Sequence, residues 1–357
     1  MILQTSFLGD TVLTLPLISA IRKNFPVRRL SLLCQPVSRE LLQDHPEIDQ
    51  IIVDDKKNLD RGIAGLRTKA AALAAERFTL ALTPHKSLRS AMMLYLAGIP
   101  HRVGFRQSRG WYLFNHRAVR DGARHDVERN LSLLEIFGFR PEDCRRDISL
   151  PLHIETLRRV DEKLRALGLT DDKPIFGINP GSVWPTKRWS VDGYAAVIQL
   201  LRKKFDGQFL LFGGPDDAEI VSSVANRCGG AAINLSGVIS LRELPAAISR
   251  CRVFVTNDSG PMHIAVAQRV PTVALFCATT PALGFYPYTD HAVVVEKDLS
   301  CRPCALHGGR RCPLGTEDCI RLITPQTVVR AVETLLQTAR PADDSWHDSF
   351  QPQRMCA

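Results

Sequence analysis

The stretch CRVFVTNDSGPMHIAVAQRVPTVALF, residues 251–276, decides the fold. Its first six residues read as a buried strand, and a polar loop follows them. Pro261 then marks the first turn of a helix that ends near Gln268, because proline is favoured at a helix start. The closing PTVALF reads as a second strand. Two parallel strands joined by a helix form a right-handed βαβ unit, which belongs to a parallel sheet.

The same alternation of strands and helices continues upstream. IFGIN (175–179) and QFLLFGG (208–214) read as strands, with Ser190 as the N-cap of the helix between them. SLRE (240–243) has the S-x-x-E pattern of a capping box, which predicts that a helix begins there. The first part of the chain repeats the alternation with four more short strands: Ile2–Thr5, Leu30–Gln35, Ile51–Asp54 and Leu80–Thr83.

The length of 357 residues exceeds what one hydrophobic core usually supports. We therefore predict the α/β class, with two Rossmann-like parallel-sheet domains that face each other across a cleft. Such folds bind ligands at the carboxyl ends of their strands. The predicted division is an N-terminal domain 1–155, a charged linker 156–170, a C-terminal domain 171–339 and a disordered polar tail 340–357.

No apolar run approaches the roughly 20 residues that span a bilayer. Asp10 also stands where a signal peptide would be apolar, so we expect a soluble cytoplasmic protein. The net charge of +9 is uneven, because residues 1–160 hold 25 Lys and Arg against 17 Asp and Glu. This excess indicates either a solvated basic face or attraction to an anionic partner such as a nucleic acid, a phospholipid surface or a phosphorylated glycolipid.

The loop TNDSGPMH (256–263) has the features of an anion site. Ser259, Gly260 and the first amides of the following helix present unpaired N–H groups, and the helix dipole favours negative charge there. Asp258 can accept hydrogen bonds from the hydroxyls of a ligand. The alternative is ordinary helix capping by Asp258 or Ser259.

A second anion loop is NPGSVWPTKRWS (179–190). Lys187 can pair with a phosphate, and Ser182 and Thr186 can donate to its oxygens. The alternative is a surface loop anchored by its two tryptophans. Neither loop is a P-loop or a G-x-G-x-x-G fingerprint, so a nucleoside triphosphatase or a nicotinamide enzyme is poorly supported. Two anion loops in one domain favour a diphosphate ligand.

Asp10 follows the first strand at the corresponding turn of the N-terminal domain. A carboxylate at this position can take a proton from an incoming hydroxyl. The alternative is capping of the next helix. Pro16 requires that helix either to kink or to start later.

These motifs together resemble the lipopolysaccharide heptosyltransferases of glycosyltransferase family nine, most closely the heptosyltransferase II type. The resemblance rests on SFLGDTVLTLP, NPGSVWPTKRW, TNDSGPMH and LSCRPCALHGGRRCPLGTEDC, in this order along the chain. It implies a GT-B fold whose N-terminal domain takes the acceptor and whose C-terminal domain binds the nucleotide sugar. It also implies inverting transfer of heptose from ADP-heptose to the inner core.

The resemblance implies a role for each matched residue. Asp10 is expected to be the general base, and Lys187 to stabilise the diphosphate. The expected donor-binding residues are Ser182, Thr186, Lys187, Asp258, Ser259, Gly260 and His263. His263 could equally be a packed helix residue.

The expected partners are the ADP-heptose donor, an anionic lipid A core acceptor and the cytoplasmic face of the inner membrane, in peripheral contact. We expect no cofactor, no metal ion and no nucleic acid. Other nucleotide sugars and other heptosyl steps stay open, as does a basic nucleic-acid-binding protein. Against the last, the basic stretch from Lys86 to Arg129 lacks interleaved stacking aromatic residues and an RNA-binding motif.

Four cysteines follow a C-x2-C-x7-C-x6-C spacing: Cys301, Cys304, Cys312 and Cys319. Four thiolates can hold zinc, although the later pair lacks the usual C-x2-C spacing. Disulfides and free thiols are the alternatives.

Overall fold

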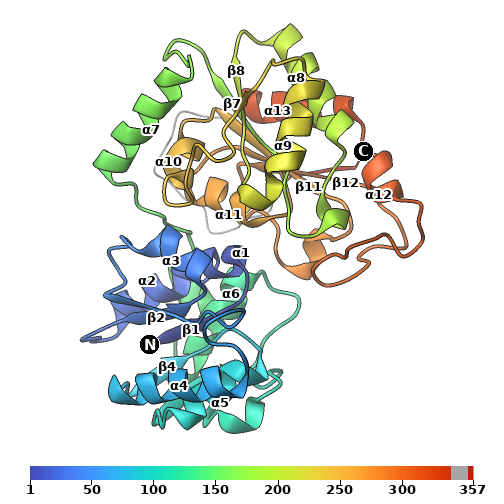
Figure 1. The fold of residues 1–357 in the computed structure, drawn as a ribbon. Helices are drawn as coiled ribbons and strands as arrows, with labels where there is room; N and C mark the ends of the chain where they lie inside the picture. Colours follow the sequence, from blue (N-terminus) through green and yellow to red (C-terminus); the bar gives the residue numbers. More distant parts are fainter. Residues whose placement is uncertain (339–352, 357) are drawn as a thin grey trace. The chain divides into compact units, whose positions relative to one another are not determined.

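The computed structural model describes residues 1–338 and 353–356 (Figure 1). The chain divides into two compact units, Met1–Pro151 and Leu152–Ala357. Each contains one parallel sheet covered by helices, so the predicted α/β class is confirmed. Among the described residues, no helix is both long and apolar enough to cross a membrane.

The first unit is built on a six-stranded sheet in the order β3-β2-β1-β4-β5-β6, with every pair parallel. Its strands are β1 (Ile2–Gln4), β2 (Ser31–Cys34), β3 (Gln50–Val53), β4 (Leu80–Leu82), β5 (His101–Phe105) and β6 (His116–Ala118). Its α-helices are α1 (Leu8–Val12), α2 (Leu15–Asn24), α3 (Pro36–Leu42), α4 (Gly62–Ala75), α5 (Leu88–Leu96) and α6 (Asp126–Leu131).

The second unit repeats this order with one more strand, β13-β12-β11-β10-β7-β8-β9. Its strands are β7 (Ile175–Asn179), β8 (Gln208–Leu211), β9 (Ile233–Asn234), β10 (Val253–Asn257), β11 (Thr272–Phe276), β12 (Ala292–Glu296) and β13 (Gln353–Cys356). Its α-helices are α7 (Ile154–Ala166), α8 (Val191–Lys204), α9 (Ala218–Arg227), α10 (Leu244–Ser249), α11 (Gly260–Ala267), α12 (Asp318–Arg321) and α13 (Pro325–Thr338).

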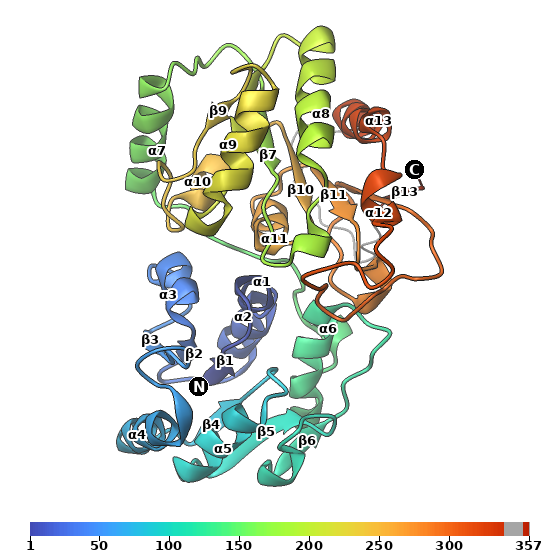
Figure 2. The ribbon, with the colours of Figure 1, turned by 45° about the vertical axis from the view of Figure 1, so that its right-hand side comes forward.

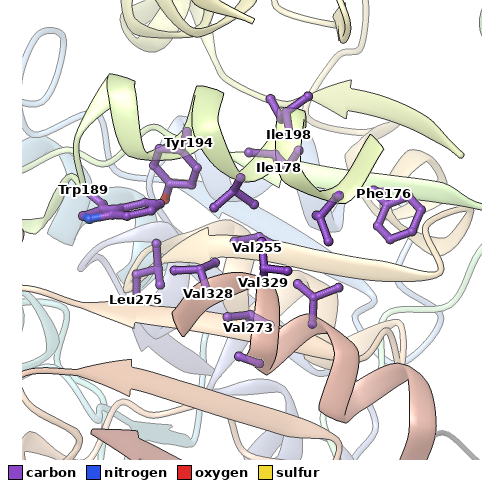
Figure 3. Packing of buried hydrophobic residues seen from close by; sticks show 14 of the residues in the cluster. Phe176, Ile178, Trp189, Tyr194, Ile198, Val255, Val273, Leu275, Val328 and Val329 are labelled. Carbon is purple, nitrogen blue, oxygen red and sulfur yellow. The ribbon is translucent and has the colours of Figure 1, made fainter. Parts of the chain in front are cut away.

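The main core of the second unit lies between its sheet and helices α8 and α13 (Figure 3). Ile178 and Val255 come from the two central strands and pack with Ile198 of α8 and Val328 of α13 in one cluster. All four side chains are fully buried or nearly so. A β-branched side chain packs well on a pleated surface, which explains why these strands are rich in valine and isoleucine.

The amino-terminal helix is broken near Pro16. Helix α1 ends at Val12, and α2 starts at Leu15 with Pro16 in its first turn. A proline costs little there, because the N–H that it lacks would have no partner within the helix. Of the two possibilities that Pro16 allowed, the structure shows a helix that starts later, at Leu15.

The helix predicted from SLRE (240–243) starts later than the motif indicates. The N–H and the hydroxyl of Ser240 both donate to the Glu243 carboxylate, but α10 begins at Leu244. Lys163 Nζ lies 2.8 Å from Glu243, and Arg159 Nε lies 3.2 Å from it. The carboxylate thus joins α7 to the start of α10. The predicted contact between Ser240 and Glu243 is present, but the helix begins at Leu244 and not at the motif.

The segment 156–170, predicted as a linker, is mostly helix α7 and belongs to the second unit, where α7 packs against α10. The predicted tail 340–357 lies largely outside the described residues. Its residues 353–356 form strand β13, which pairs in parallel with β12, so disorder is wrong for these four residues.

Candidate active site

The two predicted anion loops start at neighbouring strands of the second sheet. Strands β7 and β10 pair side by side, and their connections lead to opposite ends of the sheet. This is a topological switch point, where open α/β sheets bind ligands at the carboxyl ends of their strands. Asn179 ends β7 and Asn257 ends β10, so both loops open at this edge.

Two buried asparagines tie the loops together, and the sequence interpretation assigned neither. Asn179 Nδ2 donates to Thr256 Oγ1 at 3.1 Å and to Ser259 Oγ at 3.4 Å. Asn257 Oδ1 accepts from the Trp189 N–H at 3.0 Å, while its Nδ2 donates to the Pro180 carbonyl at 2.8 Å. The sequence did contain a signal for these two residues. Each is a polar amide at the end of a buried strand, and a buried amide needs hydrogen-bond partners.

Lys187 and Asp258 form an ion pair at the centre of the site. Lys187 Nζ lies 2.7 Å from Asp258 Oδ2, and the two side chains are 14% and 6% exposed. Thr279 Oγ1 also donates to Asp258 Oδ2 at 2.7 Å. The structure therefore brings together two residues that the sequence placed in separate loops.

The amino end of α11 carries no side-chain cap. Ser259 is its N-cap residue, with an extended backbone, and makes no capping hydrogen bond. The Ser259 hydroxyl donates instead to the Asn257 carbonyl at 3.2 Å. Capping by Asp258 or Ser259, the alternative interpretation of this loop, is not observed. Gly260 begins the helix, so the first helical residue adds no side chain of its own at this positive end.

Ser182 and Thr186 are both buried; Ser182 contacts another part of the same loop, and Thr186 contacts a distant segment. The Ser182 carbonyl accepts from Arg188 Nε at 2.7 Å. Thr186 Oγ1 accepts from the Gly309 N–H at 2.8 Å and lies 3.0 Å from the Gly309 carbonyl. In this structure the Thr186 hydroxyl connects the Lys187 loop to the cysteine-containing segment.

Asp10 lies in the first unit, at the third position of α1 and just after β1. Its Oδ2 accepts from Ser6 Oγ at 2.5 Å and from the Phe7 N–H at 3.1 Å. The carboxylate therefore caps α1 from within, at its third position, and not as the N-cap of a following helix, which was the alternative interpretation. Its role as a base stays a prediction.

Two further polar residues lie at the same edge of the first sheet, and the sequence interpretation missed both. His85 follows β4, and its Nδ1 lies 3.2 Å from Thr5 Oγ1 and 3.0 Å from Ser90 Oγ. Lys56 Nζ donates to the Thr5 carbonyl at 2.5 Å. Strands β1 and β4 flank the switch point of this sheet, so these groups lie where a ligand is expected.

Residues 67–311 match the family model described as glycosyltransferase family 9 (heptosyltransferase). The chain belongs to glycosyltransferase family 9. Lipopolysaccharide heptosyltransferase 2 of Salmonella typhimurium is 28% identical over 351 residues, which cover 94% of this chain and 98% of that protein.

Two solved family 9 structures are similar along almost the whole chain. One is a family 9 glycosyltransferase from Veillonella parvula, with a TM-score of 0.83, 27% identity and coverage of 95% of this chain and 97% of that one. The other is E. coli ADP-heptose LPS heptosyltransferase II, with a TM-score of 0.76, 25% identity and coverage of 94% and 98%. The fold is therefore GT-B, as the resemblance implied.

The four cysteines of this family 9 chain are free thiols in the structure. Among the described residues, no group of three or more His, Cys, Asp or Glu side chains is arranged to hold a metal ion. The Cys312 thiol accepts hydrogen bonds from backbone N–H groups, that of Glu317 above all, which lower its pKa. None of the four cysteines is in a disulfide, so that alternative is not observed, while the choice between bound zinc and free thiols stays a prediction.

His263 is buried on the first turn of α11, and its Nδ1 has no hydrogen-bond partner. Burial lowers the pKa of His263 to about 4, although Asp258 opposes this effect. The imidazole is therefore neutral near pH 7. It is a packed residue with one unused polar atom, so a role in donor binding stays a prediction.

We expect the free energy of unfolding to fall as the pH drops from about 6.5 to about 4, because unfolded His263 binds a proton in this range and folded His263 does not. The lowered pKa corresponds to about 3 kcal/mol. Urea unfolding near pH 7 and near pH 4.5 measures the loss, which should be smaller in His263→Gln. His85, whose pKa burial also lowers to about 4, contributes equally to both proteins. Equal losses would show that His263 titrates normally.

Proposed function

We propose that this chain is an inverting glycosyltransferase that moves L-glycero-D-manno-heptose from ADP-heptose to the heptosylated Kdo-lipid A inner core of lipopolysaccharide. This is the heptosyltransferase II reaction. Membership of family 9 and the similarity to heptosyltransferase 2 support it. The observation that carries the proposal is the Lys187–Asp258 pair beside the uncapped end of α11, at the switch point of the second sheet.

In this proposal the second unit binds the nucleotide sugar. The ammonium group of Lys187 has three N–H donors, so it can stay paired with Asp258 and still contact a diphosphate. The end of α11 at Ser259 and Gly260 supplies further positive potential. Departing ADP develops negative charge, and groups that stabilise this charge more than bound substrate lower the barrier.

The first unit takes the acceptor in this proposal. The attacking hydroxyl of a heptose has a pKa far above 7, so its proton must leave as the new bond forms. Asp10 accepts that proton as general base. A single displacement inverts the anomeric centre, and neither a covalent enzyme intermediate nor a cofactor is required. The enzyme works at the cytoplasmic face of the inner membrane, without binding nucleic acid.

A panel of donors and acceptors tests this function. The purified protein is incubated with ADP-heptose and, separately, with Kdo-lipid A carrying no heptose, one heptose or two. We expect transfer only to the acceptor with one heptose, and none from ADP-glucose. Transfer to another acceptor would assign another heptosyl step, and use of another nucleotide sugar would assign a different transferase. No transfer from any donor would contradict the function.

Gly308 allows the cysteine-containing segment to lie directly on Lys187. Its φ is +82°, and a Cβ at this position would stand 2.8 Å from Lys187 Cγ. We expect Gly308→Ala to push Lys187 away and to raise the KM for ADP-heptose about 10- to 100-fold. Initial rates at varied concentrations of ADP-heptose measure this KM.

Gly315→Ala is the matched control. Gly315 has a φ of +73°, but a Cβ there would meet nothing within 4 Å. Both alanines carry about 1 kcal/mol or more of backbone strain, whereas only the one at 308 approaches Lys187. An equal KM in the two variants would show that strain, and not the contact with Lys187, sets the effect.

A further inference from the structure

Helix α5 and the 3-10 turn η1 (Trp111–Leu113) expose five large apolar side chains on the first unit. The two segments touch, because a Cβ on Gly110 would lie 2.5 Å from Ala91 Cβ of α5. We call this surface the α5–η1 patch. Its apolar members are between 37% and 57% exposed: Leu88, Tyr95, Leu96, Trp111 and Tyr112.

Two arginines of the patch stack on its aromatic rings. Arg117 Cζ lies 4.9 Å from the centroid of the Trp111 ring, and Arg102 Cζ lies 5.5 Å from that of Tyr95. Arg102 also donates to the Leu113 carbonyl at 2.9 Å, which joins β5 to η1. The prediction that this basic stretch lacks stacking aromatic residues is therefore wrong.

The patch carries only positive charge along its sequence. Residues 86–120 contain seven Lys and Arg and no Asp or Glu. Arg89 pairs with Asp54, and Arg120 pairs with Asp126. In the part of the chain that the structure describes, no acidic side chain lies within ion-pair distance of the other four arginines: Arg102, Arg106, Arg109 and Arg117.

The patch begins at the edge of the sheet that carries Asp10. Helix α5 starts shortly after β4, and the Arg109 N–H donates to the Lys86 carbonyl just before it. From this edge α5 runs away along the sheet for about 13 Å, nine residues at 1.5 Å each. Figure 2 shows α5 beside β4 and β5. A surface bound by the patch would therefore reach the edge where the acceptor is expected.

We propose that the α5–η1 patch docks the first unit on a phospholipid bilayer with anionic headgroups. Trp111 and Tyr112 enter the boundary between headgroups and acyl chains, where amphipathic rings are favoured. The arginines without acidic partners meet the lipid phosphates. The purpose of the contact, to reach a lipid-linked acceptor, rests on the proposed function.

A bilayer fits the patch better than a nucleic acid or a protein does. Leu88 and Leu96 are aliphatic and exposed, so their burial among acyl chains would stabilise a membrane-bound state. Neither offers an aromatic ring on which a nucleic-acid base could stack. The rings of Trp111 and Tyr95 are each covered on one face by an arginine, which blocks base stacking on that face. A protein partner would need a groove that is acidic and also accepts several exposed apolar side chains. An anionic membrane offers negative charge and an apolar interior along its whole surface.

Co-sedimentation with vesicles tests the proposal on the full-length chain. The vesicles contain phosphatidylethanolamine with phosphatidylglycerol, or phosphatidylcholine alone. We expect binding to the first and little to the second. Arg109→Gln with Arg117→Gln should lower partitioning about 25-fold, fivefold for each charge. Trp111→Ser with Tyr112→Ser should lower it at least about tenfold. Circular dichroism checks that the variants fold.

Matched controls come from the second unit. Arg202→Gln with Lys203→Gln removes two exposed charges from α8, and Ile154→Ser with Leu322→Ser removes two exposed apolar groups. Both pairs should change partitioning less than about twofold. Equal binding to the two vesicle types, or equal losses in patch and control variants, would overturn the proposal. Tighter binding to single-stranded RNA than to anionic vesicles, lost with the same patch variants, would overturn it in favour of a nucleic acid.

Activity assays separate this proposal from the proposed function. Turnover of an acceptor embedded in vesicles should fall in the patch variants in parallel with binding. Turnover of a deacylated, water-soluble acceptor should not change, because the patch holds none of the residues assigned to the reaction. If the wild-type protein has no activity on the soluble acceptor, the proposed function fails while the vesicle result still decides the docking surface.

Discussion

Replacing Asp10 with asparagine is expected to lower kcat for heptosyl transfer by about 10²- to 10⁴-fold, while the KM for ADP-heptose stays within about twofold. The asparagine is close in shape to the aspartate but cannot take the proton of the attacking hydroxyl. Donor affinity should persist because the residues assigned to the nucleotide sugar belong to the other unit. Initial rates with a soluble heptosylated acceptor measure both constants.

The helix cap offers a control for this experiment. Asp10 Oδ2 accepts hydrogen bonds from Ser6 Oγ and the Phe7 N–H, and an asparagine oxygen can accept both. A cap is worth about 1 kcal/mol, so the thermal stability of Asp10→Asn should change little. Ser6→Ala removes one capping contact and keeps the carboxylate, and its kcat should fall by less than about threefold. Full turnover by Asp10→Asn would remove the base assignment, and an equal loss in Ser6→Ala would assign the effect to the cap.

The strands that flank the site could be predicted from the sequence because their signals are local. The predicted strand IFGIN is β7 without change, and Ser190 accepts the N–H of Gly193 as the expected N-cap. Alternating apolar runs, caps and prolines each act within a few residues. The anion loops could be located as well, because each motif directly follows a predicted strand and parallel sheets bind ligands at the carboxyl ends of their strands.

Long-range contacts could not be predicted in this way. The SLRE motif did not indicate that Glu243 also pairs with Lys163, 80 residues earlier in the chain. The Thr186 hydroxyl bonds Gly309, which lies 123 residues away. The motif that contains Thr186 indicated a hydroxyl available to a phosphate. In the structure this hydroxyl is instead hydrogen-bonded to Gly309. The sequence interpretation of that segment had considered only its four cysteines.

The roles of Lys187 and Asp258 illustrate the same limit. Each motif alone indicated a ligand contact, and neither indicated that the two side chains would be paired at 2.7 Å and largely buried. A buried ion pair is costly to break, since the remaining charge keeps its desolvation penalty without its partner. In the proposed function, the pair therefore couples the binding of a diphosphate to the stability of the second unit.

Lys187→Ala is accordingly expected to lower both activity and stability. The loss of a positive group that faces the departing ADP should reduce kcat/KM by about 10²- to 10³-fold. The free energy of unfolding should fall by about 3 kcal/mol, because Asp258 is left buried without its ion-pair partner and keeps the hydrogen bond from Thr279. Initial rates and urea unfolding measure the two effects. Lys203→Ala, which removes an exposed charge from α8, should change neither.

A second substitution separates the catalytic loss from the loss of stability. Lys187→Ala combined with Asp258→Asn leaves no unpaired buried charge, so most of the free energy of unfolding should return. Activity should stay low, because the positive group is still absent. If activity returns together with stability, Lys187 is a structural residue, and the charge that stabilises departing ADP must come from elsewhere. If Lys187→Ala alone keeps more than about half of kcat/KM, the proposed role of this loop in donor binding is contradicted directly.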